Sequence, residues 1–165
     1  LANRRTLDDA LHAEWQRAER EGYWLALVMI DIDNFKAYND NYGHQAGDAC
    51  IRALGQVLRS NVRRAGDLAA RYGGEEFVFL LPGVDLDDAV TVAQRLREAF
   101  MALAIPHAHS ATANVVTISL GVAAVVPTAG LSSETLLRHA DDALYEAKRS
   151  GRNSVQAARE LAENN

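Results

Sequence analysis

The hydrophobic positions of this chain follow two periods, and the first is that of an amphipathic helix. Apolar residues recur at spacings of three and four, which places them on one helical face. Such stretches cover residues 6–21, 47–62, 85–103 and 133–150. Gly22 and Gly151 are the expected ends of the first and last helices, and Ser132 or Ser133 is the expected N-cap of the last.

The other apolar stretches predict β-strands. Residues 25–30 form a continuous apolar run, which is typical of a strand covered on both faces. Residues 68–72 and 76–81 predict two short strands, and residues 115–126 predict a longer one rich in Val and Ile. Gly73 and Gly74 predict a tight hairpin turn between the short strands, because glycine adopts positive φ without steric cost.

The order of elements is helix, strand, helix, hairpin, helix, strand, helix. It predicts an α/β (α+β) fold with a mixed central sheet, flanking helices and a βαββαβ core of the ferredoxin or polymerase-palm kind. No repeat or linker interrupts the pattern, so we expect one domain over residues 1–165. Because the chain begins at Leu1 and enters a helical pattern at once, we expect a fragment of a longer protein with an upstream region.

Composition narrows the class of protein. The 165 residues are 48% hydrophobic and 24% charged, which excludes a disordered tail, a fibre and a coiled-coil rod. No apolar run approaches the ~18–20 residues that span a bilayer, so we expect no membrane segment. Cys50 is the single cysteine, which excludes an intrachain disulfide and suits the cytoplasm. The net charge of −5 disfavours nucleic acid as a partner, although divalent cations can bridge an acidic domain to small polyanions.

Two clusters of acidic residues are candidates for chemistry. Asp31 and Asp33 end the first predicted strand, and at a spacing of two they point to the same side. The alternative is that they cap a helix starting near Asn34. Glu75 and Glu76 follow the two glycines of the hairpin, where acids are often merely solvated.

Considered together, the two clusters indicate a metal site. A central strand and an adjacent hairpin could bring Asp31 close to Glu75. Facing carboxylates repel each other unless a cation lies between them. Hard oxygen ligands select Mg²⁺ or Mn²⁺, and these ions in turn hold phosphates.

With these motifs in view, the sequence resembles the GGDEF family of diguanylate cyclases, in the variant whose signature is GGEEF. The resemblance covers nearly the whole chain through five ordered motifs: residues 3–5 (NRR), 31–36 (DIDNFK), 39–48 (ND, GH and GD), 73–77 (GGEEF) and 140–153 (AD, then K, G, R and N). Five motifs at matching spacing are far more specific than the five-residue signature alone. The fold implied is the palm-like fold of nucleotidyl cyclases.

The activity that the resemblance implies is the condensation of two GTP molecules to cyclic di-GMP and two pyrophosphates. Two Mg²⁺ or Mn²⁺ ions serve each active site, and a homodimer brings two GTP molecules together. Each 3′-hydroxyl attacks the α-phosphate of the other nucleotide. In such phosphoryl transfer, positioning and electrostatics supply most of the acceleration.

The resemblance also assigns the acids. Asp31 and Glu75 would hold the metal ions, with the carbonyl of Ile32 as a further ligand. Glu76 would be a metal ligand, a hydroxyl contact or a structural acid. Asp33 matches a position that supports the site without ligating the metal.

The substrate contacts implied by the resemblance involve backbone and cationic groups. The residues implied are Asn34, Phe35, Lys36, Gly73, Gly74, Lys148 and Arg152. Backbone N–H groups near Asn34 and Phe35 would open a helix toward the phosphates. Without the resemblance, Lys148 would be interpreted as a residue of the last helical turn that interacts favourably with the helix dipole. Lys36 and Arg152 would be interpreted as solvated surface residues.

Guanine would be selected by Asp48, with Asn39 as its amide partner. A carboxylate accepts hydrogen bonds from guanine N1–H and N2–H₂, and it would repel the N1 acceptor of adenine. The alternative is that Asp48 is an N-cap, since it stands at the expected helix start. The two roles are compatible.

A regulatory site is the last implication of the resemblance. Arg64 and Asp67 form an R-x-x-D, five residues before the GGEEF signature, where the family binds its product allosterically. Arg95 is a candidate second arginine, and the alternative is a silent solvated Arg–Asp pair. The five histidines show no metal-ligand spacing and are interpreted as turn or surface residues: His12, His44, His107, His109 and His139.

Two rival functions remain open on these residues. A degenerate domain would bind GTP or cyclic di-GMP without turnover, but the acids, Asn39 and Lys148 are all present. A nucleotidyl cyclase that uses another base is the second rival, and Asp48 argues against adenine.

Overall fold

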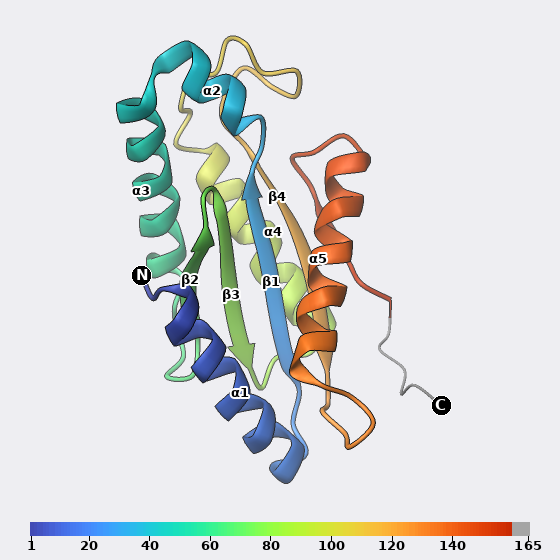
Figure 1. Cartoon of the computed structure of the whole chain (residues 1–165). Helices are drawn as coiled ribbons and strands as arrows, with labels where there is room; N and C mark the ends of the chain where they lie inside the picture. The colour runs from blue at the N-terminus through green and yellow to red at the C-terminus, as the bar shows by residue number, and fades with distance from the viewer. Residues whose placement is uncertain (160–165) are drawn as a thin grey trace.

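A computed structural model describes residues 1–159 of the chain (Figure 1). The helices are α1 (Arg4–Glu21), α2 (Phe35–Tyr42), α3 (His44–Ser60), α4 (Leu86–Met101) and α5 (Ser133–Arg149). The strands are β1 (Leu25–Ile32), β2 (Leu68–Gly73), β3 (Glu76–Pro82), β4 (Ile118–Val125) and β5 (Val155–Ala157). Within these residues, no helix is long and apolar enough to cross a membrane.

The strands form one mixed sheet in the order β2-β3-β1-β4-β5. β1 lies antiparallel between β3 and β4, and β5 pairs in parallel with β4. From β1 to β4 the chain order is βαββαβ, with α2 and α3 together forming the first helical connection, so the predicted mixed sheet and its core order are confirmed.

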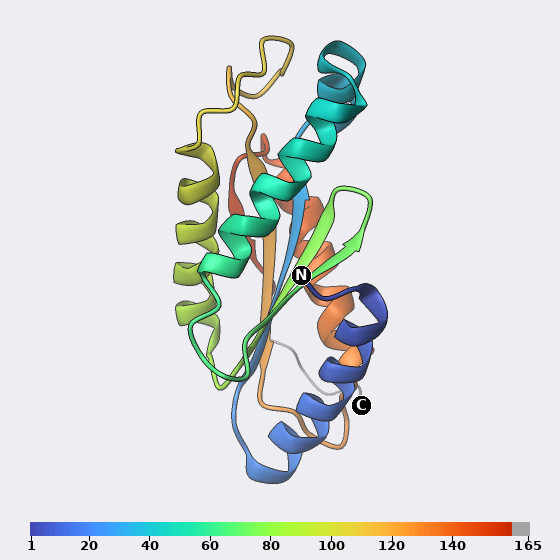
Figure 2. The same ribbon diagram turned by 90° about the vertical axis from the view of Figure 1, so that its left-hand side faces the viewer.

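Helices cover both faces of the sheet, which explains the continuous apolar run of β1 (Figure 2). Ala26, Val28 and Ile30 join the core formed with α3 and α4. Leu25, Leu27 and Met29 join the core formed with α1 and α5. Alternate residues of a strand point to opposite faces, so a strand between two helical layers is apolar at every position.

The structure corrects several predicted boundaries. The polar stretch before the second predicted helix forms α2, and α3 begins at His44 instead of near Gly47, with Gly43 at a φ of 89° between them. β5 was not predicted, because three residues are too few to show a period. β4 begins at Ile118 instead of Val115.

The hairpin turn lies one residue further along than predicted. Gly73 still pairs with Glu76, so the two turn residues are Gly74 and Glu75. Gly74 alone of the two glycines has a positive φ, at 54°. Glu75 is therefore presented at the tip of the hairpin.

Candidate active site

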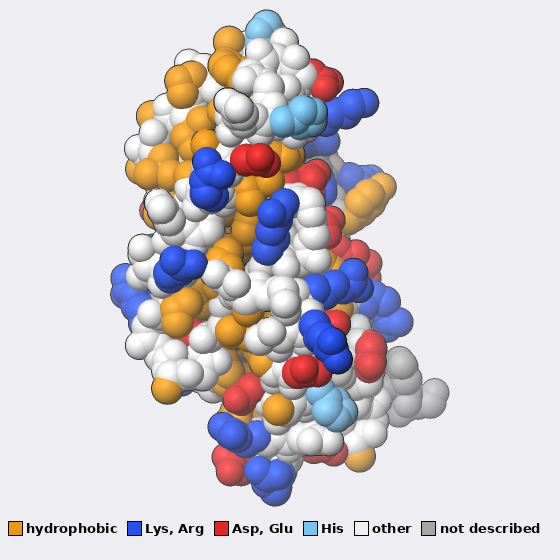
Figure 3. All heavy atoms as spheres, turned by 60° about the vertical axis from the view of Figure 1, so that its left-hand side comes forward, with side chains coloured by type: hydrophobic (Ala, Val, Ile, Leu, Met, Phe, Trp, Pro, Cys, Tyr) orange, Lys and Arg blue, Asp and Glu red, His pale blue; other side chains and the backbone are white. Residues whose placement is uncertain are grey.

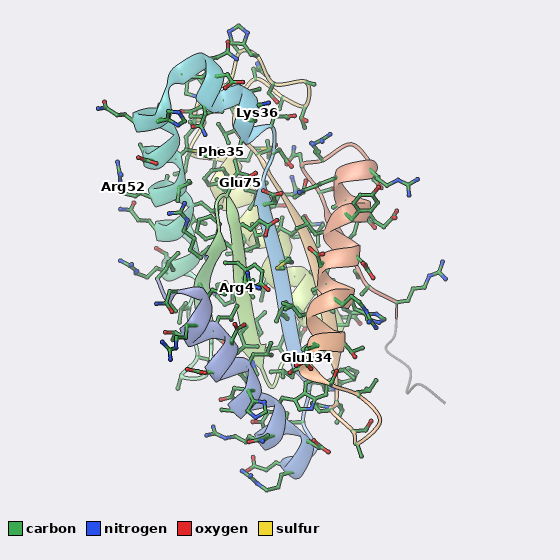
Figure 4. The ribbon with its side chains drawn as sticks, viewed as in Figure 1. Arg4, Phe35, Lys36, Arg52, Glu75 and Glu134 are labelled. Atoms are coloured by element: carbon green, nitrogen blue, oxygen red, sulfur yellow. The ribbon has the colours of Figure 1, made fainter. Side chains whose placement is uncertain are left out.

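The two acidic clusters meet where β1 ends beside the β2–β3 hairpin. Asp31 lies opposite Glu76 in the register of β1 and β3. The backbone N–H of Ile32 donates to the carbonyl of Glu75 at 3.3 Å. Figure 4 shows Glu75 at the hairpin tip, below Phe35 and Lys36 of α2. The structure thus brings together the acids that the sequence places 44 positions apart.

Asp31 is a buried carboxylate with one oxygen available. Its Oδ2 accepts a hydrogen bond from the ammonium of Lys148, near the end of α5. Its Oδ1 is buried and has no hydrogen-bond partner within residues 1–159. Burial raises the pKa of Asp31 to about 6; Glu75 and Glu76 add to the rise, and Lys148 opposes it. The negative charge of Asp31 is thus incompletely compensated by the side chains around it.

The donor set fits a hard divalent cation shared with a substrate. Among the described residues, no three His, Cys, Asp or Glu side chains converge on one point. Asp31 Oδ1 and the carboxylates of Glu75 and Glu76 are the acidic groups available at this end of the sheet. Mg²⁺ is commonly held by one or two carboxylates and completes its shell with phosphate oxygens and water.

Asp33 has a different role from Asp31. Its buried carboxylate accepts from Thr117 Oγ1 at 2.8 Å, Ser119 Oγ at 2.6 Å and the backbone N–H of Asn153 at 2.9 Å. These bonds join the end of β1 to β4 and to the turn after α5. Asn34 is the N-cap of α2 without a side-chain cap bond, so capping by Asp31 or Asp33 is not observed.

The three predicted cations occupy different environments. Lys148 forms an ion pair with Asp31, so its main interaction is with this carboxylate and not with the dipole of α5. Lys36 lies exposed in the first turn of α2, above Glu75 (Figure 4). Arg152 is exposed in the turn after α5, at a left-handed φ of 64°.

The predicted base-reading pair lies at the junction of α2 and α3. Asn39 Oδ1 is buried without a partner among the described residues. It lies against Gly47, where a Cβ atom would be only 1.8 Å away. Asp48 is exposed in the second turn of α3, and the N-cap of that helix is Gly43. The alternative interpretation of Asp48 as an N-cap is therefore wrong.

The R-x-x-D motif lines a hollow of about 150 Å³ that also includes Arg95. Asp67 Oδ2 accepts from the backbone N–H of Arg64 at 3.1 Å, and Asp67 Oδ1 is buried without a partner in residues 1–159. Arg95 Nε donates to Asn61 Oδ1 at 3.2 Å. The solvated Arg–Asp pair is not observed, because Asp67 binds the loop backbone and no salt bridge joins it to Arg64 in the described chain.

The sequence did not indicate a groove between α3 and the hairpin. It has a volume of about 330 Å³, with apolar lining from Ile51 and Phe77 and with Arg52 and Arg71 beside them. Figure 3 shows exposed apolar side chains and scattered Lys and Arg side chains on this side of the molecule. Arg71 Nε donates to the carbonyl of Gly74 at 2.9 Å, which braces the turn that presents Glu75.

The prediction of turn or surface histidines is only partly right for His107. Its carbonyl accepts from the backbone N–H of Ser110 at 3.3 Å, so it begins a turn, but it does not lie on the surface. His107 is fully buried, and its Nε2 lies 3.2 Å from the carbonyl oxygen of Asn34. It follows Pro106 in a stretch with neither a helical nor a strand period, so the sequence pattern could not indicate a buried face. The other histidines are at least partly exposed.

Sequence comparison relates the chain to proteins of known family. Residues 1–154 match the family described as "Diguanylate cyclase, GGDEF domain". The response regulator PleD of Caulobacter vibrioides is 43% identical over 155 residues, which are 94% of this chain and 34% of that protein. Diguanylate cyclase DgcP of Pseudomonas aeruginosa is 39% identical, over 96% of this chain and 23% of that protein. The chain thus spans about a third or less of these two relatives.

Solved structures agree with the sequence comparison. The GGDEF domain of DgcB from Caulobacter crescentus, solved in complex with c-di-GMP, superposes with a TM-score of 0.86 at 37% identity, covering 96% of this chain and 89% of that one. The active GGEEF domain of a diguanylate cyclase from Vibrio cholerae has a TM-score of 0.83 at 31% identity, covering 98% and 99%. The chain therefore belongs to the GGDEF family of diguanylate cyclase domains.

Proposed function

We propose that this domain condenses two GTP molecules to cyclic di-GMP and releases two pyrophosphates. The observation that carries the proposal is the buried Asp31 carboxylate, which has one unpartnered oxygen, lies next to the hairpin that carries Glu75 and Glu76, and is braced by Lys148. A site that concentrates uncompensated negative charge next to exposed cations suits a metal–triphosphate complex.

The acids at the end of β1 would hold two Mg²⁺ or Mn²⁺ ions through Asp31, Glu75 and the carbonyl of Ile32. When bound, these ions lower the pKa of the attacking 3′-hydroxyl and neutralise the triphosphate. Glu76 faces Asp31 across the two strands and would contact a metal ion or the hydroxyl.

The chain itself would bind and orient the phosphates. Lys36, Lys148 and Arg152 would supply positive charge, and the first backbone N–H groups of α2, near Asn34 and Phe35, have no partner within the helix. Gly73 and Gly74 would let the phosphates approach the hairpin closely, because neither carries a side chain and a Cβ at either position would have open space around it.

Asp48 and Asn39 would select guanine. Asp48 would accept from guanine N1–H and N2–H₂, and the exposed position of its carboxylate leaves it available. The unpartnered Asn39 Oδ1 would accept a further hydrogen bond from the base. Adenine would be disfavoured because its N1 is an acceptor facing a carboxylate.

The productive species would be a homodimer. One domain offers one set of base-reading residues, so two domains are needed to present two GTP molecules to each other. Activity should therefore rise with protein concentration by mass action. We infer that residues 1–165 form a single domain that acts in the cytoplasm.

Product inhibition would act at the hollow formed by Arg64, Asp67 and Arg95. Arginine can grip phosphate oxygens or the guanine O6 and N7 edge with two hydrogen bonds. The free Asp67 Oδ1 can accept from guanine N1–H. Arg64→Ala should therefore weaken cyclic di-GMP binding while initial turnover is retained; equal binding and inhibition would contradict this assignment.

The experiment is incubation with GTP and Mg²⁺ at high protein concentration, followed by mass analysis of the product. Asp31→Ala and Glu75→Gln should abolish cyclic di-GMP without unfolding the domain. Glu134→Gln is the matched control, because Glu134 lies exposed in the first turn of α5, at the opposite end of the sheet (Figure 4). GTP binding without any product would instead support a non-catalytic regulatory module.

A further inference from the structure

His107 lies in the loop between α4 and β4, which passes beside α2 (Figure 1). Its ring is fully buried and meets the rings of Tyr38 and Tyr42 edge-on, with centroid distances of 5.3 and 6.1 Å. The hydroxyl of Tyr42 accepts from the backbone N–H of Ala108 at 3.0 Å. These contacts hold the loop against α2.

The polar contact of His107 determines its tautomer. Nε2 lies 3.2 Å from the carbonyl oxygen of Asn34, and a carbonyl oxygen only accepts, so Nε2 carries the proton. The same oxygen accepts the first helical hydrogen bond of α2, from the N–H of Tyr38 at 3.0 Å. Nδ1 is buried without a partner in residues 1–159, which fits a ring that is protonated on Nε2 alone.

Asn34 has a backbone conformation that needs such support. Its φ is 53°, in the left-handed region that residues other than glycine adopt uncommonly and that Asn adopts more readily than most when its side chain is hydrogen-bonded. The side-chain amide of Asn34 does not cap α2. It donates instead to Ser110 Oγ and Thr112 Oγ1, both at 2.9 Å. The α4–β4 loop therefore holds Asn34 by its side chain and by its carbonyl.

We propose that His107 is a positioning residue for the phosphates of GTP. Asn34 is the residue at which the chain turns from Asp33, bonded to β4, into α2. Its peptide orientation determines where the first N–H groups of α2 point. By holding the Asn34 carbonyl, His107 sets the direction of those N–H groups toward the phosphates. This inference rests on the proposed function, since it deepens the phosphate site of that reaction.

The test compares two variants of His107. His107→Phe keeps an aromatic ring against Tyr38 and Tyr42 but has no N–H donor. His107→Gln places an amide nitrogen the same number of bonds from the backbone as Nε2 and restores the donor. We expect His107→Phe to raise the KM for GTP and the calorimetric Kd for GTP with Mg²⁺ about tenfold, with a smaller change in kcat. His107→Gln should stay within about threefold of the wild type.

A merely structural role would give a different result. It would lower the melting temperature of both variants and reduce active protein, with KM unchanged. Affinity for cyclic di-GMP at the Arg64 hollow should be unchanged in His107→Phe, because that hollow lies in other elements. An unchanged KM and Kd for GTP in His107→Phe would overturn the proposal.

A measurement on the wild-type protein tests the contact between His107 and Asn34 without depending on how the variants fold. Nitrogen-15 NMR of the imidazole should show a proton on Nε2 and a bare Nδ1, and a proton on Nδ1 alone would overturn the contact with Asn34. If the wild type binds GTP but forms no cyclic di-GMP, the proposed reaction fails while the GTP affinities still decide the role of His107. If it binds no GTP, both proposals fall.

Discussion

Gly121 of β4 should not tolerate any side chain, because the backbone of α5 lies directly on it. A Cβ atom at this position would lie 2.1 Å from the amide nitrogen of Leu144 and 2.2 Å from the carbonyl oxygen of Ala140. Both atoms belong to the helix backbone, so no side-chain rotation can relieve the clash. Alanine normally suits a strand better than glycine, so propensity alone predicts the opposite effect of Gly121→Ala.

The size of the effect follows from the displacement that the clash requires. Ordinary contacts of a Cβ atom begin near 3.4 Å, so α5 would have to move away by more than 1 Å. Overpacking of this kind costs about 1–3 kcal/mol and sometimes more, and here a whole helix must move. We expect a loss of about 3 kcal/mol in the free energy of unfolding, and a melting temperature lower by roughly 6–12 °C. Because α5 carries Lys148, the variant that folds should also make less product.

Gly55→Ala is the matched control. Gly55 lies inside α3, and the nearest atoms to a new Cβ belong to the flexible side chain of Leu1, at 3.2 Å or more. The same substitution should therefore stabilise the domain by about 0.5–1 kcal/mol through helix propensity. Urea and thermal unfolding of both variants measure the contrast. A Gly121→Ala protein as stable as the wild type would refute the close approach of α5 to β4.

Three further substitutions test the site. Asp33→Asn replaces one acceptor oxygen by a donor and removes the negative charge, so one hydroxyl partner must reverse its hydrogen bond and the remaining bonds are no longer charge-assisted; we expect a loss of about 2 kcal/mol in denaturant unfolding, and no loss would contradict the network. Asp31 has a pKa raised to about 6, so the folded domain holds this proton more tightly than the unfolded chain, and stability should fall as the pH rises from about 4 through 6. Asp31→Asn should remove that fall and stabilise the metal-free domain at pH 7 by about 2 kcal/mol, whereas parallel stability profiles would show that the charge is not penalised. Gly47→Ala should displace Asn39 and weaken GTP binding in calorimetry with little change in melting temperature, and unchanged affinity would exclude the proposed role of Asn39.

The sequence by itself predicted the helices and strands that are long enough to show a regular pattern of apolar residues. The run at residues 25–30 indicated a strand covered on both faces, because two helical layers demand apolar residues at every position. The four helical stretches correspond to α1, α3, α4 and α5, since one face of each packs on the sheet. The proximity of Asp31 to Glu75 could be predicted too. The hairpin that carries Glu75 forms locally, and β1 is the one long apolar strand that precedes it in the sequence.

Tertiary structure decided what depends on partners distant along the chain. Asp33 binds Thr117 and Asn153, which are 84 and 120 positions away, so no local pattern distinguishes it from Asp31. His107 is buried because Tyr38 and Tyr42 of α2 face it, and Gly121 is needed because α5 lies on β4. Periodicity indicates which face of an element is apolar, but hydrogen-bond partners and close approaches arise only when separate elements pack together.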